Sequence, residues 1–145
     1  MGTLIIKPAE TVQLEEIQHL LKNSGLPFED IGIHLNNFLC VMNYEKIIAV
    51  GGLEIYDDVA LLRSLAVTER KRNEGIGQMI YSALIDHAKT KNINTIYLLT
   101  ETAEKFFLKN GFTKVDRNKI PDTIKNTHEY KVLCAESAIV LMKNI

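Results

Sequence analysis

A basic turn containing two glycines, residues 72–77, carries the residues of this chain best suited to chemistry. The apolar residues 61–67 before it predict a buried strand, and the spacing of apolar residues over 75–90 predicts a helix. The first N–H groups of a helix lack intrahelical partners, and the helix dipole adds positive potential there. The turn therefore predicts a phosphate or pyrophosphate site, formed by Arg72, Asn73, Gly75, Ile76, Gly77 and Gln78.

Two familiar phosphate-binding motifs do not fit this turn. A P-loop places Lys and then Ser or Thr after its last glycine, whereas Gln78 and Met79 follow Gly77. A dinucleotide-binding fingerprint needs a third glycine at position 80, where the chain has Ile80. The ligand expected is therefore neither a mononucleotide held by a P-loop nor a dinucleotide.

Composition narrows the class of protein. The chain has 145 residues, which suits a single domain over 1–145, and 46% of them are hydrophobic. A net charge of −1 gives no general attraction to nucleic acid or to an anionic membrane, and no apolar run is long enough to span a bilayer. Cys40 and Cys134 lack the spacing of metal ligands, so we expect no metal and a cytoplasmic location with reduced thiols.

The elements that must position the turn follow the order β-α-α-β-β-β-α-β-α-β-β. Pro8 suits the first turn of a helix that continues to about Asn23, after a first strand over residues 3–7. The other strands are expected at 38–42, 47–55, 61–67, 95–100, 112–115 and 138–143, with further helices after residue 30 and over 75–90 and 103–110. The sequence thus predicts one α/β domain.

The turn following an apolar strand resembles the acetyl-CoA pyrophosphate loop of the GCN5-related N-acetyltransferases (GNAT). Ala103, Gly111 and Phe112 match a second motif of that superfamily, in which Phe107 stands where a tyrosine is usual. The resemblance covers nearly the whole chain. It implies an α/β (α+β) domain with a central, mixed, mostly antiparallel sheet of six to seven strands and about four flanking helices.

The resemblance also implies how acetyl-CoA is held as co-substrate. The backbone of Leu65 and Val67 would pair with the pantetheine amides, so that the cofactor behaves like an added strand. Phe106 or Phe107 would lie near the pantetheine. Because Phe107 has no proton to give, the leaving thiolate would need another donor, for which Tyr97 and Tyr130 are candidates, or would leave unprotonated.

A narrower likeness concerns residues 117–138. This tail is most similar to N-acetyltransferases associated with arsenic-resistance operons, which commonly read Leu-Cys-Pro-x-Ser-Ala where this chain has Leu133-Cys134-Ala135-Glu136-Ser137-Ala138. The likeness implies an arsenic-related setting without identifying the acceptor.

Three polar residues are candidates for the acceptor side. Acetyl transfer needs a neutral amine, so a base that acts directly or through water would help. Glu54, late in the third strand, is the first candidate for this base. Glu101, just past the fifth strand, is the second candidate, and it is also a candidate for binding the acceptor. Arg63 suits a clamp on the acceptor's carboxylate or a structural salt bridge. Alternation puts it on one face with Leu61, Leu65 and Val67, without indicating which face is solvated.

The function expected is acetyl transfer from acetyl-CoA to a small amino-acid-like amine, by direct attack without a covalent enzyme intermediate. A non-catalytic acyl-CoA-binding sensor is the alternative, since Phe107 replaces the usual tyrosine. A homodimer is expected from the superfamily alone.

Overall fold

The computed structural model describes residues 3–133 and 138–145, and a seven-stranded sheet runs through it in the order β1-β2-β3-β4-β5-β7-β6. Only the β4–β5 pair is parallel; every other neighbouring pair is antiparallel. The expected mixed, mostly antiparallel sheet is confirmed. The strands are β1 Leu4–Pro8, β2 Phe38–Asn43, β3 Lys46–Tyr56, β4 Val59–Val67, β5 Thr95–Thr100, β6 Thr113–Lys114 and β7 Ile139–Asn144.

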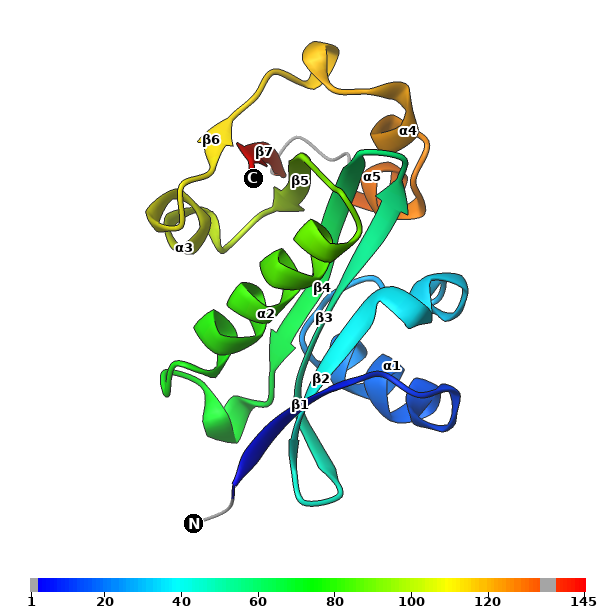
Figure 1. Ribbon diagram of the computed structural model, residues 1–145, viewed down its shortest axis with the longest axis vertical. Coiled ribbons are helices and arrows are strands. Elements are labelled where there is room, and N and C mark those ends of the chain that lie inside the picture. The colour runs from blue at the N-terminus through cyan, green and yellow to red at the C-terminus, as the bar shows by residue number, and fades with distance from the viewer. Residues whose placement is uncertain (1–2, 134–137) are drawn as a thin grey trace.

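Helices cover both faces of the sheet. The long helix α2 packs along β2, β3 and β4 on one face, while α1 lies on the other side (Figure 1). None of the described helices is both long and apolar enough to cross a bilayer. The α-helices are α1 Leu14–Asn23, α2 Ile76–Thr90, α3 Glu104–Lys109, α4 Asp122–Lys125 and α5 His128–Leu133, and the 3₁₀ helices are η1 Thr11–Gln13, η2 Ile31–Asn37, η3 Glu69–Lys71 and η4 Arg117–Lys119.

The start of the first helix differs from the sequence expectation. Pro8 belongs to the edge strand β1, opposite Leu39, and the strand pairing continues as the Ala9 N–H donates to the Phe38 carbonyl at 2.9 Å. Proline is tolerated at a sheet edge because the missing N–H need not face another strand. The α-helix therefore begins only at Leu14, after the 3₁₀ turn η1.

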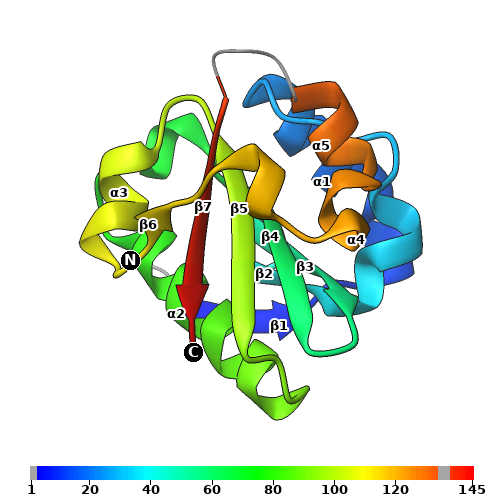
Figure 2. The ribbon, with the colours of Figure 1, turned by 90° about the horizontal axis from the view of Figure 1, so that it is seen from above.

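The tail folds into helices that the sequence did not predict. Ile120 and Ile124 of this segment are buried against Leu61, Tyr97 and Val140 of the sheet. In Figure 2 α4 and α5 lie to the right of β4 and β5, whereas α2 lies at the lower left. The tail thus completes the covering of the face on which α1 lies. Cys134 lies outside the described residues.

Strands β4 and β5 separate partway along their length. Their pairing covers only Val59–Leu61 and Thr95–Tyr97, so the later residues of the two strands are not paired with each other. On its other edge β4 carries a bulge, because the register with β3 shifts between Val50 and Gly52 and Ser64 has a φ of 62°. The bulge thus lies beside Gly51 and Gly52 of β3.

The glycines in β3 are required by packing. A Cβ built on Gly52 would lie 2.2 Å from the Phe38 ring, and one on Gly51 would lie 2.6 Å from Leu84. Both distances are far below van der Waals contact, so only glycine lets Phe38 and Leu84 pack directly on the strand on opposite faces of the sheet.

Candidate functional site

A cavity of about 680 Å³ opens where β4 and β5 separate. It reaches from the glycine turn before α2 to a buried group of charged residues on β4 and α5. Most of the residues predicted for a ligand line it: Arg63, Leu65, Val67, Arg72, Asn73, Gly75, Gly77, Gln78, Phe106 and Phe107. Leu26, Ser64, Lys71, Thr100, Thr102 and Glu129 also line it and were not predicted to do so.

The turn before α2 has the geometry of an anion site. Gly75 is the N-cap residue of α2 with a φ of 82°, and Asn73 has a φ of 66°, so the chain turns sharply into the helix. The first turn of α2 contains no acidic side chain. Arg72 donates through Nε to the Val67 carbonyl at 3.0 Å, which ties the turn back to the end of β4. A helix N-terminus lined by Lys71 and Arg72 favours a phosphate-like group.

Of the residues predicted for the base or for ligand binding, three lie outside the cavity lining. Ile76 is buried in the core beneath α2. Glu101 is exposed just after β5. Glu54 is 1% exposed, on the same face of the sheet as Arg63.

Arg63 is buried at the centre of a network of carboxylates. Its Nη1 lies 2.7 Å from Asp30 Oδ2 and 2.7 Å from Glu54 Oε2, and its Nη2 lies 2.9 Å from Asp30 Oδ1. Nε donates to Ser64 Oγ at 2.9 Å, and Nη2 also donates to the Pro27 carbonyl at 3.4 Å. Since a guanidinium has five N–H donors, these five bonds occupy all of them. Clamping an acceptor's carboxylate would require Arg63 to exchange one of these partners.

The network shifts the pKa values of its members. Burial alone would lower the pKa of Arg63, but its hydrogen bonds to Asp30 and Glu54 and the charge of Glu129 outweigh burial and raise it. Burial tends to raise the pKa of Asp30, but the hydrogen bond and the charge of Arg63 lower it overall. Tyr56 donates its hydroxyl to Glu54 Oε1, and burial together with this bond raises the pKa of Tyr56. Arg63 therefore stays charged, paired with an ionised Asp30.

The alternation expected for β4 is wrong at the bulge. Leu65 and Val67 pack into the core beside α2, whereas Leu61 and Ala66 pack on the opposite face. Arg63 shares that second face, since it contacts Asp30 and Glu54 there. Because Ser64 adds a residue with left-handed backbone, the period of two is broken between Arg63 and Leu65. The residues predicted for the cofactor thus face one side of the sheet and Arg63 the other.

Glu129 on α5 is a carboxylate that the sequence did not single out for the site. It is 2% exposed, lines the cavity, and its Oε1 lies 3.5 Å from Arg63 Nε. Burial, with the nearby charges of Glu54 and Asp30, raises its pKa to about 8 despite Arg63. No local pattern marks this residue, because its burial depends on how the tail packs on the sheet.

Asp30, His34 and Glu54 place ligand atoms within 4.8 Å of one another, close enough in principle to hold a metal ion. Arg63 already binds the two carboxylates, and His34 Nε2 lies 3.4 Å from Glu54 Oε1. A guanidinium in contact with both carboxylates competes with a cation for their oxygens. We therefore interpret this group as part of the ion-pair network.

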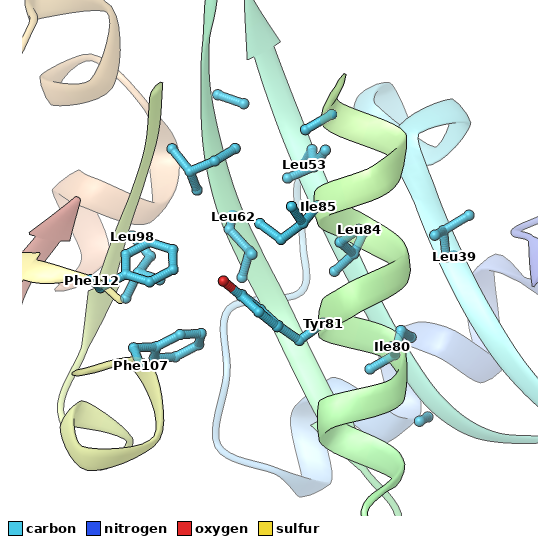
Figure 3. Packing of buried hydrophobic residues seen from close by; sticks show 14 of the residues in the cluster. Leu39, Leu53, Leu62, Ile80, Tyr81, Leu84, Ile85, Leu98, Phe107 and Phe112 are labelled. Carbon is cyan, nitrogen blue, oxygen red and sulfur yellow. The ribbon is translucent and has the colours of Figure 1, made fainter. Parts of the chain in front are cut away.

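An aromatic cluster lies between α2 and α3. Tyr81 contacts Phe106, Phe107 and Phe112 edge-on, with ring centroids 5.9 to 6.2 Å apart. Figure 3 shows the Tyr81 ring reaching from α2 into this cluster. Within the described part of the chain its hydroxyl has no hydrogen-bond partner, and burial raises its pKa. Tyr97 and Tyr130, the proton donors considered from the sequence, do not line the cavity.

Replacing Tyr81 with phenylalanine is expected to raise the free energy of unfolding by about 1 kcal/mol, because a buried hydroxyl without a partner costs about that much. Urea denaturation measures the change. Tyr44→Phe is the matched control, since Tyr44 is 79% exposed and the same change there should have no effect. A loss of stability in Tyr81→Phe would show that the hydroxyl has a partner in solution.

Sequence comparison identifies the family to which most of the chain is similar. A profile of the acetyltransferase (GNAT) family matches residues 9–112. An amino-acid acetyltransferase from Mycobacterium tuberculosis is 30% identical over 74 residues, which are 50% of this chain and 42% of that protein. An uncharacterized N-acetyltransferase from Chlorobaculum tepidum is 27% identical over 97 residues, 66% of this chain and 62% of that protein. The matched regions thus span less than two thirds of these curated relatives.

Solved structures show the same fold. N-acetylglutamate synthase from Neisseria gonorrhoeae, complexed with coenzyme A and N-acetyl-glutamate, superposes with a TM-score of 0.85 at 18% identity, over 99% of this chain and 35% of that one. A Mycobacterium tuberculosis protein in complex with CoA gives a TM-score of 0.81 at 18% identity, and the superposition covers 97% of this chain and 99% of that one. The ribosomal-protein-S18-alanine N-acetyltransferase of Escherichia coli gives a TM-score of 0.76 at 20% identity, and the superposition covers 99% of this chain and 94% of that one.

Proposed function

Because the chain belongs to the acetyltransferase (GNAT) family, we propose that it is an acetyl-CoA-dependent N-acetyltransferase whose acceptor is the amine of a small amino-acid-like molecule. The observation that carries the proposal is one continuous cavity between β4 and β5, which joins the glycine turn to the buried side chains of Arg63 and Glu129. A donor with its pyrophosphate on the turn would extend its acyl group towards the acceptor end.

The residues of β4 suit the pantetheine of such a donor. Beyond Leu61 the strand no longer pairs with β5, so its edge is open to hydrogen bonds from an extended ligand. We propose that the backbone of Leu65 and Val67 makes these bonds. The turn from Arg72 to Gln78 would bind the pyrophosphate, and Phe106 and Phe107 would contact the pantetheine.

The reaction we propose is direct attack of the amine on the acetyl carbonyl. Backbone N–H groups near Leu65 would stabilise the oxyanion. The sequence-based assignments of Glu54 as a base and of Glu101 to acceptor binding stay predictions. Since Glu54 does not line the cavity, it would act as a base only through water. No step of the reaction calls for a metal.

The proposed class of acceptor is inferred from two of the similar proteins. Two similar proteins are named as an amino-acid acetyltransferase and an N-acetylglutamate synthase, which favours an amino-acid acceptor. The arsenic-related setting rests on the tail sequence alone, so an arsenic-containing amino-acid analogue belongs in any panel of acceptors. The cytoplasmic location and the homodimer expected from the sequence stay predictions.

The test is release of free thiol from acetyl-CoA, followed with the protein across a panel of amino acids, amines and arsenic-containing analogues. We expect turnover with at least one amino-acid-like acceptor above the rate of hydrolysis without acceptor. Calorimetry with acetyl-CoA measures donor binding separately. Tight binding without turnover across the panel would instead favour the acyl-CoA-binding sensor, and absence of binding would contradict both.

A further inference from the structure

Glu129 is the buried carboxylate that lines the cavity, and its position suggests a role that Glu54 cannot fill directly. Its side chain enters from α5, next to Arg63, with Oε1 3.5 Å from Arg63 Nε. That separation is longer than a hydrogen bond, because Arg63 Nε donates to Ser64 instead. Glu129 therefore faces the cavity while it makes a long ion pair with Arg63.

Glu54 is held quite differently. One of its oxygens accepts from Tyr56 and lies near His34, and the other accepts from Arg63. Each oxygen thus already has a partner, and the residue is absent from the cavity lining. A carboxylate held in this way suits the positioning of Arg63 better than contact with an acceptor.

We propose that Glu129 is the group that accepts the proton of the acceptor's amine, while Glu54 and Asp30 position Arg63; this rests on the acetyltransferase function proposed above. The ammonium gives one proton to the Glu129 carboxylate. The freed lone pair forms the N–C bond to the acetyl carbon, and the C–S bond breaks with its electron pair left on the CoA thiolate. The nitrogen's second proton passes to the thiolate or to water, and Glu129 returns its own proton to solvent.

The charges around Glu129 fit this role. Two carboxylates, those of Asp30 and Glu54, contact the one guanidinium of Arg63, and Glu129 adds a third negative charge once it is ionised, so the acceptor end attracts an ammonium group. A base works best when its pKa is near the operating pH, and the pKa of about 8 set chiefly by burial of Glu129 meets that condition.

The decisive experiment compares Glu129→Gln with Glu54→Gln, using acetyl-CoA and the acceptor that the wild-type protein turns over fastest. We expect Glu129→Gln to lower kcat/KM for the acceptor by about 100-fold or more, in the range of general-base catalysis. Glu54→Gln should lose less, and acetyl-CoA affinity should be unchanged in both. Thermal melting checks that both variants fold, and Glu129→Asp, which keeps a shorter carboxylate, should retain part of the activity.

The pH profile separates proton transfer from a structural role. The deficit of Glu129→Gln should shrink as pH rises through the pKa of the acceptor's own amine, because a neutral amine needs no base. A deficit that stays constant with pH would overturn the proposal, and so would a larger loss in Glu54→Gln than in Glu129→Gln. If the wild-type protein turns over no acceptor, the proposed function fails and this assignment fails with it.

Discussion

Replacement of Arg63 by alanine is expected to lower the free energy of unfolding by about 3–5 kcal/mol, the cost of removing one partner from a buried ion pair. Arg63 is 2% exposed, and Asp30, Glu54 and Glu129 lie around it. Without the guanidinium, the buried Glu54 and Glu129 and the half-buried Asp30 lie near one another without the charge that pairs them.

Urea denaturation of Arg63→Ala and of Arg70→Ala at several pH values measures this effect. Arg70 is an exposed arginine outside the cavity lining, so its loss should change stability little. The penalty of Arg63→Ala should be smaller at pH 5 than at pH 8, because protonation relieves the repulsion among the carboxylates. A stable variant with only a raised KM for the acceptor would instead support the carboxylate clamp considered from the sequence.

Glu129 by itself makes the free energy of unfolding of the wild-type protein depend on pH. Its pKa is raised on folding from 4.5 to about 8, so the folded state binds the proton more tightly than the unfolded chain. Its contribution to stability is therefore fully present below pH 4.5 and is lost as the pH rises through about 8. Glu129→Gln should reduce this loss, and an unchanged pH dependence would show that Glu129 is ionised at neutral pH in the free protein.

Reversal of the charge on Arg72 is the second large effect expected. Arg72→Glu should weaken acetyl-CoA binding by about 10- to 100-fold, since it removes a cation from the turn and places an anion beside the expected pyrophosphate. The side chain is exposed, so the loss should decrease at high salt, where charges at the surface are screened.

Isothermal titration of acetyl-CoA at two salt concentrations measures this loss. Arg70→Glu is the matched control: it makes the same change of charge two residues away, at a position that does not line the cavity. An equal loss of affinity in both variants would mean that general charge, and not the turn, attracts the ligand. Unchanged affinity in Arg72→Glu would contradict the pyrophosphate assignment.

Local signals in the sequence were enough to predict strand β5 and the turn before α2, which border the cavity. The strand Thr95–Thr100 has the predicted bounds, and α2 begins at Ile76, one residue from the expected position. Both follow from features that act within a few residues: a run of apolar side chains, and Gly75 in a left-handed conformation before a helical repeat. The residues of this turn that the sequence assigns to the cofactor line the cavity, except Ile76, and their role in binding acetyl-CoA stays a proposal.

Two features of the acceptor half could not be predicted, because each depends on residues far away in the chain. Ser64 is not glycine, so nothing local indicates its positive φ, and the bulge it forms reverses the faces expected for Leu65 and Val67. The helices of the tail are short, and burial of Ile120 and Ile124 against β4, β5 and β7 accounts for them better than helix propensity does.

The order of the strands along the chain, the turn before α2 and the likeness to acetyltransferases could all be predicted from the sequence, because these depend on local pattern. Which charged groups contact one another, by contrast, follows from the three-dimensional packing. Arg63, Glu54, Asp30 and Glu129 come from β4, β3, the residue before η2, and α5. They contact one another because the tail and the segment before η2 pack on one face of the sheet. Since these residues are far apart in the sequence, no local pattern predicts the contact.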